Sequence, residues 1–340
     1  MKMLHMTKER KGKFHPEHIR NVVRRRYYLD LSSDYRDSLV LAGTGRSGTT
    51  WISEVINYRN EYRLMDEPDR NVRIEAFAHF NAIQYIRPDD DNPAWIEPVG
   101  LSLSGRLRND WSDRFNTRII SNKRLIKFIR ASLYLKWMVN HFPGLKVAFL
   151  MRHPCAVCLS QSRLEWEIDL SDILLVQPQL MEDFLEPFRT QIAAADTLFE
   201  KRLWMWCVDN YVALSQLETG DVHLAFYESF CEEPEQEIER LFNFYDKQWD
   251  TSVYEAMRKP SNSSKPDSAI VTGKNRVDSW MKHITDEQRE LARRMLHQFG
   301  LDTIYSVDSP LPDTDAAWEM LARPAQPVAF QPPARQHSGS

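Results

Sequence analysis

The sequence lacks the patterns of a disulfide-rich protein and of a metal protein. Four cysteines in 340 residues do not form a disulfide framework. Cys155 and Cys158 have CxxC spacing, but further ligands at matching spacing are missing, so we interpret them as reduced thiols on a helix. The ten histidines are scattered and none has HExxH spacing. We therefore expect no metal site.

The sequence also lacks a long apolar run and a basic excess. No stretch approaches the ~18 consecutive apolar residues of a membrane span, and the basic N-terminus is not followed by the apolar segment of a secretory signal. The formal net charge of −4 excludes the overall positive field that would attract nucleic acid. With the reduced cysteines, these absences predict a cytoplasmic protein without a nucleic-acid partner or a transmembrane segment. The oligomeric state is left open.

The two ends of the chain differ in composition from the middle. Residues 1–35 are polar and basic, with an arginine run at 24–26, which predicts a solvated N-terminal arm or a first helix. Residues 308–340 are rich in Pro, Ala, Gln and Ser. That composition buries too little apolar surface to fold, so it predicts a disordered tail. One folded domain is expected between the ends, over residues 36–307.

Short β-rich apolar runs alternate with helical patterns in that domain. This order predicts an α/β fold of three layers, with a central, mainly parallel β-sheet flanked by helices. Such sheets bind ligands beyond the carboxyl ends of their strands, so sites are expected just after Ala42, Phe128 and Leu150. The predicted strands are Leu39–Ala42, Leu125–Phe128, Val147–Leu150 and Val222–Phe226. The predicted helices are Thr49–Tyr58, Ala131–His141, Pro154–Trp166, Met181–Phe199, Arg202–Leu217, Pro234–Tyr245 and Asp286–Phe299.

A phosphate-binding loop is predicted directly after the first strand. Residues 43–51 read GTGRSGTTW and lead into a helical pattern. The glycines allow a tight turn with inward N–H groups, and the helix adds its own free N–H groups and the positive end of its dipole. Arg46 adds a planar cation suited to phosphate or sulfate oxygens. The predicted fold is therefore P-loop-like, with a plain turn as the alternative.

The loop departs from that of nucleoside triphosphatases at one position. The spacing from Gly43 to Gly48 fits GxxxxGK[ST], but Thr49 stands where the lysine would be. The strand KVAFLM ends in Arg152 rather than in a magnesium-binding aspartate. Both departures weaken the interpretation as a kinase or ATPase. A small-molecule kinase with a degenerate phosphate loop stays an alternative.

Part of the loop resembles the 5′-phosphosulfate loop of sulfotransferases, namely Arg46, Ser47, Gly48, Thr49, Thr50 and Trp51. Arginine at the first position is similar to the carbohydrate, tyrosylprotein and many bacterial branches, whereas the cytosolic branch usually has lysine. The resemblance spans about residues 38–300. It implies a domain at 36–307 that transfers a sulfuryl group in line from 3′-phosphoadenosine-5′-phosphosulfate (PAPS) to a hydroxyl acceptor. It also implies that Trp51 lies near the adenine, with core packing as the alternative.

Two further matches concern the 3′-phosphate of that donor. Arg152 follows the third predicted strand and Ser160 comes eight residues later, as in the family's 3′-phosphate signature. Residues 273–280 resemble the segment that closes over the nucleotide, where either Lys274 or Arg276 would reach the 3′-phosphate. A charged lid that touches nothing is the alternative for this segment.

The resemblance also suggests which groups carry the chemistry. Lys127 matches the lysine of the cytosolic branch's Lys-x-His, but Ile129 replaces the histidine. A glutamate spaced as Glu67 is from the loop is the proposed base of the tyrosylprotein and bacterial branches. We therefore predict Glu67 as general base, with Asp66 as its nearest rival. Lys127 and Arg46 would stabilise the charge that develops during transfer, and Arg130 is a further candidate contact.

The acceptor is not indicated by any motif. Residues 69–120 and 164–200 match no pattern, and their aromatic side chains either stack on sugar rings or pack in the core. Family analogy favours a carbohydrate or lipid-linked hydroxyl. A non-catalytic nucleotide-binding protein remains a further alternative. The aromatic residues in question are Trp95, Trp111, Trp166, Tyr85 and Phe80.

Overall fold

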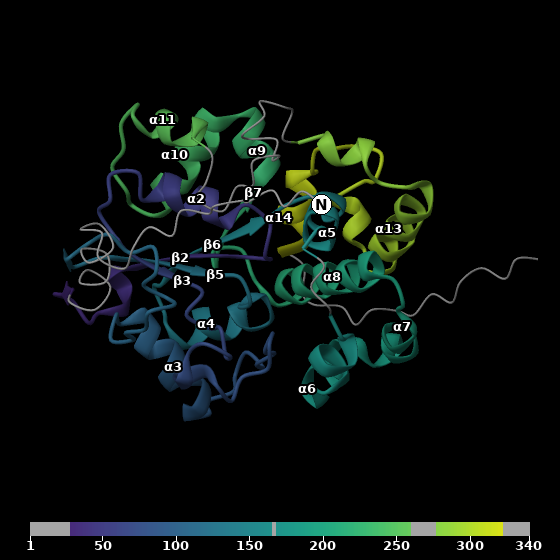
Figure 1. Ribbon diagram of the computed structural model, residues 1–340, viewed down its shortest axis with the longest axis horizontal. Helices are drawn as coiled ribbons and strands as arrows, with labels where there is room; N and C mark the ends of the chain where they lie inside the picture. The colour runs from purple at the N-terminus through teal and green to yellow at the C-terminus, as the bar shows by residue number, and fades with distance from the viewer. Residues whose placement is uncertain (1–27, 165–167, 260–276, 322–340) are drawn as a thin grey trace, which may run out of the picture.

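The computed structural model describes residues 28–164, 168–259 and 277–321, and its centre is a five-stranded parallel sheet (Figure 1). The strand order is β3-β5-β2-β6-β7, and each neighbouring pair is parallel. A separate two-stranded parallel ribbon pairs β1 with β4. The strands are β1 (Leu29–Asp30), β2 (Ser38–Gly43), β3 (Arg63–Asp66), β4 (Ile120–Ser121), β5 (Arg124–Phe128), β6 (Lys146–Met151) and β7 (His223–Phe226).

Helices cover both faces of the sheet (Figure 1). On β2, Leu39 and Leu41 pack in one hydrophobic cluster, with α2 and α10, while Val40 and Ala42 pack in another, with α3, α4 and α8. Because both faces are buried, the strands are apolar at nearly every position. The predicted three-layer α/β fold is confirmed. The α-helices are α2 (Thr49–Ile56), α3 (Pro93–Leu103), α4 (Leu135–His141), α5 (Pro154–Ser162), α6 (Pro178–Leu180), α7 (Arg189–Ala194), α8 (Leu198–Gln216), α9 (Tyr227–Glu232), α10 (Pro234–Phe244), α11 (Val253–Arg258), α13 (Asp286–Gln298) and α14 (Thr314–Leu321).

The helix predicted over Met181–Phe199 is not continuous. The segment forms a π-helical turn at Met181–Leu185, a 3-10 turn at Glu186–Phe188 and then α7. Pro187 explains the break, because proline has no N–H to donate and its ring collides with the preceding turn of an α-helix. The next helix, α8, begins at Leu198, where the side chain of Thr197 accepts a hydrogen bond from the Glu200 N–H.

The folded region extends past both predicted domain limits. Tyr28 is buried and β1 pairs with β4, so residues 28–35 belong to the domain rather than to an arm. At the other end, α14 buries Ala317 and Leu321 against the core, so part of the predicted tail is ordered. Spacing of four residues places both side chains on one helix face, a pattern that the composition of the whole tail hides. The remaining parts of the arm and tail lie outside the described residues.

Candidate functional site

The predicted site residues gather where strands β2, β5 and β6 end. Ala42 is in register with Phe128, and Gly43 with Leu150, so the three carboxyl ends are level. The loop of Arg46 follows β2, Lys127 is the last residue but one of β5, and Arg152 follows β6. This is the edge at which the sequence predicted the site.

The loop at residues 43–48 makes a tight turn into α2. Arg46 and Gly48 both have positive φ, 77° and 100°, and Gly48 caps the helix that begins at Thr49. The Ser47 hydroxyl is buried and has no hydrogen-bond partner. A buried hydroxyl without a partner is costly, so this orphaned group fits a loop shaped to hold an anion.

Gly48 is expected to tolerate no side chain, because a Cβ there would collide with the ring of Tyr227. Gly48→Ala should lower the free energy of unfolding by about 2 kcal/mol or more, through this overlap and the positive φ. Gly45→Ala is the matched control, since its Cβ would meet only Ile129 at an ordinary 3.6 Å. Urea unfolding compares the two variants. Equal stability of both would contradict the packing of Tyr227 against the loop.

The two predicted anion clamps touch each other. Arg46 Nε donates to Ser160 Oγ at 3.0 Å, and Arg152 Nη1 donates to the Arg46 carbonyl at 3.1 Å. Ser160 is thus bonded to Arg46, whereas the sequence paired it with Arg152. The guanidinium of Arg152 lies 3.9 Å from the centre of the Tyr227 ring, and its Nε is buried without a partner.

The charges of these two arginines are not balanced locally. Burial, and then the charge of Arg152, lower the pKa of Arg46, although a guanidinium stays protonated at neutral pH. In the described part of the chain, neither arginine forms an ion pair with a carboxylate. Two adjacent partly buried cations with unused donors are a site for an anion with more than one charged group.

Comparison of the sequence with known protein families gives one match. The sequence model of one family, described as the sulfotransferase domain, matches residues 36–299. This chain belongs to the sulfotransferase family.

Solved sulfotransferase structures resemble this sulfotransferase only distantly. The sulfotransferase domain from the curacin biosynthetic pathway is 13% identical, with a TM-score of 0.44 over 77% of this chain and 97% of that one. A sulfotransferase from Alicyclobacillus acidocaldarius is also 13% identical, with a TM-score of 0.42 over 84% and 94%. Mouse sulfotransferase SULT7A1, complexed with PAP, is 13% identical, with a TM-score of 0.40 over 82% and 88%. Comparison with curated proteins gives no significant match.

In this sulfotransferase, Lys127 contacts both the start of α2 and two acidic residues. Its Nζ donates to Thr50 Oγ1 at 3.1 Å, forms an ion pair with Asp66 and lies 3.7 Å from Glu67 Oε1. The Lys127 side chain is 4% exposed. This buried ammonium lies between a loop hydroxyl and two carboxylates. It can therefore stabilise negative charge that develops on either side of it.

Glu67 is the more accessible of the two predicted base candidates. Its side chain is 11% exposed, whereas that of Asp66 is 2% exposed and ion-paired with both Lys127 and Arg114. Glu67 has a positive φ of 53°, and its N–H donates to the Lys127 carbonyl at 2.8 Å. This left-handed turn carries the carboxylate away from the strand and towards Arg130, whose Nη1 lies 3.2 Å from Oε2.

The charge of Glu67 is held by several cations. Burial raises its pKa, but Lys127, Arg130 and Arg114 together outweigh burial and hold the pKa below its ordinary value. The carboxylate is therefore ionised at neutral pH. The ionised carboxylate can accept a hydrogen bond. Its basicity falls as the neighbouring cations bind it more strongly.

Sequence reasoning missed the arginines that surround this carboxylate. Arg114 pairs with Asp66 and lies 3.5 Å from Glu67, and Arg70 lies 3.8 Å from Glu67. Both guanidinium groups stack on Trp111, at 3.7 and 4.4 Å from its ring centre. The face of Trp111 is thus covered by arginines rather than open to a sugar. One usable signal for this cluster lay in the sequence, namely several arginines near Trp111 in a segment that matches no family pattern.

Other predicted residues have different outcomes. Trp51 is 4% exposed, and its Nε1 donates to the Met257 carbonyl at 3.2 Å, so it packs in the core beside Tyr227. Phe80 and Tyr85 are also buried in the core. The residues that lie outside the described part of the chain are Lys274, Arg276 and Trp166.

A buried carboxyl supports the second clamp from behind. Glu228 accepts hydrogen bonds from the His153 N–H at 2.8 Å and from the Tyr305 hydroxyl at 3.3 Å. Burial raises the pKa of Glu228 from 4.5 to about 7, although the His153 N–H and the charge of Arg152 act in the opposite direction. Glu228 is therefore largely protonated in mildly acidic solution.

This raised pKa predicts a pH-dependent gain in stability for Glu228→Gln. Between about pH 4.5 and 7 the unfolded chain loses a proton that the folded chain keeps, so the wild type loses stability as pH rises. The variant should match the wild type near pH 4.5 and exceed it by about 1 kcal/mol or more at pH 8. Urea unfolding at both values measures the difference, with exposed Glu239→Gln as control. A gain that is equal at both pH values would contradict the assignment.

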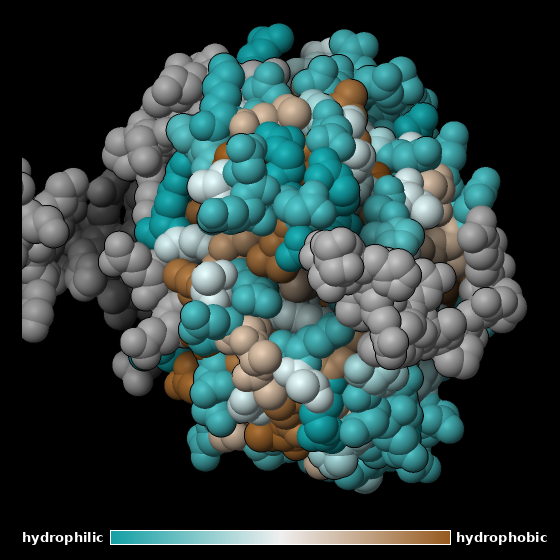
Figure 2. Space-filling view, turned by 90° about the vertical axis from the view of Figure 1, so that its right-hand side faces the viewer, coloured by the Kyte–Doolittle hydropathy of each residue, from teal (hydrophilic) through white to brown (hydrophobic). Residues whose placement is uncertain are grey.

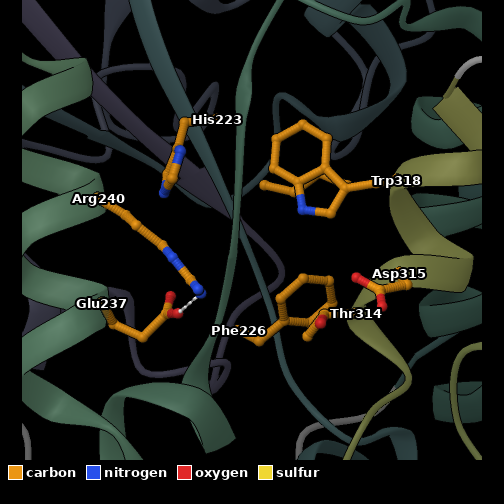
Figure 3. A pocket seen from close by; sticks show the side chains of 8 residues that line it. His223, Phe226, Glu237, Arg240, Thr314, Asp315 and Trp318 are labelled. Atoms are coloured by element: carbon orange, nitrogen blue, oxygen red, sulfur yellow. Dashed lines mark hydrogen bonds and ion pairs between the residues drawn. The ribbon is translucent and has the colours of Figure 1, made fainter.

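A separate cavity of about 310 Å³ lies along the outer edge of β7, between α10 and α14 (Figure 3). His223 projects into it from β7, and Glu237 and Arg240 form an ion pair at 2.6 Å on α10. None of the predicted site residues lines this cavity. Among the residues that the structure describes, no group of three or more His, Cys, Asp and Glu is placed to hold a metal, and no helix is long and apolar enough to cross a membrane.

Proposed function

We propose that this sulfotransferase moves a sulfuryl group from PAPS to a hydroxyl-bearing acceptor, by in-line transfer and without a metal. The observation that carries the proposal is the contact between Arg152 and the Arg46 carbonyl at 3.1 Å. It brings a loop cation and a second cation to one spot where neither has a carboxylate partner. A donor with phosphate groups on both the 5′ and 3′ positions of one adenosine would supply an anion to each of the two cations.

The donor would be held by two groups of residues. The 5′-phosphosulfate would accept hydrogen bonds from the loop and the start of α2, where the free N–H groups and the helix dipole favour negative charge. The 3′-phosphate would be bound by Arg152 and Ser160 and, by the family resemblance, by Lys274 or Arg276, which lie outside the described residues. The residues of the 5′ side are Arg46, Ser47, Gly48, Thr49 and Thr50.

The chemical step would use Glu67 as general base. The acceptor oxygen loses its proton to Glu67 and forms a bond to sulfur, while the bond between sulfur and the 5′-phosphate oxygen breaks. The leaving group is 3′,5′-diphosphoadenosine. Lys127 and Arg46 would stabilise the bridging oxygen as its charge grows. As Lys127 is drawn towards that oxygen, its hold on Glu67 weakens, and the basicity of Glu67 rises when the proton must be taken.

For the acceptor, we propose a carbohydrate or lipid-linked hydroxyl, in keeping with the arginine-containing loop of those family branches. At the site, the carboxylate of Glu67 lies beside the guanidinium groups of Arg70 and Arg130, 3.8 and 3.2 Å away. Cys155, Cys158 and Cys207 are buried thiols that form no disulfide with one another, which supports the cytoplasmic location predicted from the sequence.

The decisive experiment is transfer from ³⁵S-labelled PAPS to fractionated glycans and lipids, in EDTA. Labelled product supports the proposed function. Phosphate transfer from ATP that needs Mg²⁺ would instead identify a kinase. Tight binding of 3′,5′-diphosphoadenosine without labelling of any acceptor would favour a nucleotide-binding protein that has no transferase chemistry.

A further inference from the structure

We propose that the solvent face of the β1–β4 ribbon docks this protein on an anionic lipid surface. The ribbon is parallel, with Leu29 in register with Ile120 and Asp30 with Ser121. Its outward side chains are apolar: Leu29 is 58% exposed, Leu31 68% and Ile120 50%. Its inward side chain, Asp30, is charged. The polarity of the ribbon is thus the reverse of that of an ordinary surface strand.

Buried charges lock the ribbon in this orientation. Asp30 forms ion pairs with Arg63 at 3.3 Å and with Arg124 at 2.8 Å, and both arginine side chains are completely buried. A slip of one residue would turn Asp30 outward and leave two buried cations without this partner. The leucines on either side of Asp30 therefore cannot turn inward, and their exposure is a fixed property of the fold.

The apolar side chains of this surface are concentrated rather than scattered. Ile119 is 49% exposed, and its carbonyl accepts a hydrogen bond from the Leu29 N–H at 2.7 Å. Half of the large hydrophobic side chains that are exposed in the described chain thus lie in β1 or β4 or directly beside them. The face on the α13 side, shown in Figure 2, is mostly hydrophilic with scattered hydrophobic side chains. Exposed apolar side chains that gather on one small element indicate an interaction site.

The charges around the patch select the partner. Arg118 and Lys123 flank β4, and Arg108 lies 4.8 Å from the ring of Tyr28, next to Leu29. Residues 1–27, which lead directly into the ribbon, contain nine Lys and Arg against two Glu, in a chain whose net charge is −4. Exposed apolar side chains with Arg108, Arg118 and Lys123 near them match a bilayer with anionic head groups, which accepts both features at once.

The position of the ribbon leaves the donor site open. Arg63 and Arg124, which hold Asp30, are the first residues of β3 and β5. The ribbon therefore lies at the amino ends of the strands, in the purple start of the described chain at the left of Figure 1, whereas the loop of Arg46 follows a carboxyl end. A protein docked through the ribbon would still bind its nucleotide. The inference does not depend on the proposed acceptor.

Sedimentation of the full-length protein with vesicles tests the proposal. We expect binding to phosphatidylcholine vesicles that contain phosphatidylglycerol, and little binding to phosphatidylcholine alone. The triple variant Leu29→Ser, Leu31→Ser, Ile120→Ser should bind the anionic vesicles at least about tenfold more weakly, since three apolar side chains no longer enter the lipid. Because these side chains are exposed, thermal unfolding should be nearly unchanged, which is checked in parallel.

The control is the double variant Val176→Ser, Leu311→Ser, which removes exposed apolar side chains outside the ribbon and should bind as the wild type does. Equal vesicle binding by the wild type and the ribbon variant would overturn the proposal. The proposal would also be wrong if binding were lost only when the arginine run 24–26 is replaced. A different result would assign the patch to a second copy of the chain. In that case the wild type would not bind vesicles and would sediment as a dimer in analytical ultracentrifugation, whereas the ribbon variant would sediment as a monomer.

Discussion

Replacing Glu67 with glutamine is expected to lower kcat by about two orders of magnitude or more, while the affinity for 3′,5′-diphosphoadenosine stays within about twofold. Glutamine keeps the size and hydrogen-bonding capacity of the side chain but cannot accept the acceptor proton. Nucleotide affinity should be preserved because Glu67 is on the far side of Lys127 from the loop, 3.7 Å from Nζ. Single-turnover transfer of labelled sulfate, together with calorimetric titration of the nucleotide, measures both quantities.

Asp66→Asn separates the two candidate bases. Asp66 is almost completely buried and ion-paired with Lys127 and Arg114, so its neutralisation leaves two cations short of a partner. Loss of stability of about 3 kcal/mol is expected for this variant, as for other broken buried pairs. Glu67→Gln should lose less stability than Asp66→Asn, because the Glu67 side chain is the more exposed of the two, although cations stabilise its charge as well. Full turnover by Glu67→Gln would place the base elsewhere, and a folded but inactive Asp66→Asn would point to Asp66.

Changing Arg152 to alanine should weaken the binding of 3′,5′-diphosphoadenosine by about ten- to a hundredfold and leave the binding of 5′-AMP nearly unaffected. One charge-assisted hydrogen bond to a buried anion contributes about 1.5–3 kcal/mol, and 1.4 kcal/mol corresponds to a factor of ten. The side chain stacks on Tyr227 and reaches the Arg46 carbonyl, so it is oriented before any ligand arrives. Isothermal titration with the two nucleotides gives the ratio directly.

Arg46→Ala is the matched comparison, because Arg46 belongs to the loop that would hold the 5′-phosphate. This variant should bind both nucleotides more weakly by similar factors, since both carry that phosphate. If Arg152→Ala likewise weakens both nucleotides equally, Arg152 does not distinguish the 3′-phosphate and the two-clamp arrangement is wrong.

The central strands could be predicted because their patterns are local. β2, β5, β6 and β7 are short apolar runs between helical segments, and each lies within a residue or two of its predicted limits. β3 escaped prediction because its sequence, RLMD, has a charge at each end. The charge of Arg63 is buried only because it meets Asp113, in a distant loop, and Asp30, in β1, at 2.9 and 3.3 Å. No property of the four residues alone shows that these partners exist.

The site divides in the same way. The loop after β2, the cation after β6 and the lysine of β5 follow from residue type and their place at strand ends, so the sequence located them. The partners of these residues came from tertiary structure. Ser160 meets Arg46 across 114 residues, and Arg114 reaches Asp66 across 48. Likewise, the turn at Glu67 depends on its pairing with the end of β5.

The sequence by itself determined the family, the layered α/β fold and the residue types that gather at the strand ends, because these depend on patterns within one strand, one loop or one helix. Only the tertiary structure decided which charges meet, how far Glu67 is held ionised, and that the leucines beside Asp30 face outward. Those properties depend on burial and on electrostatic contact between distant segments, and both are set when the chain has folded.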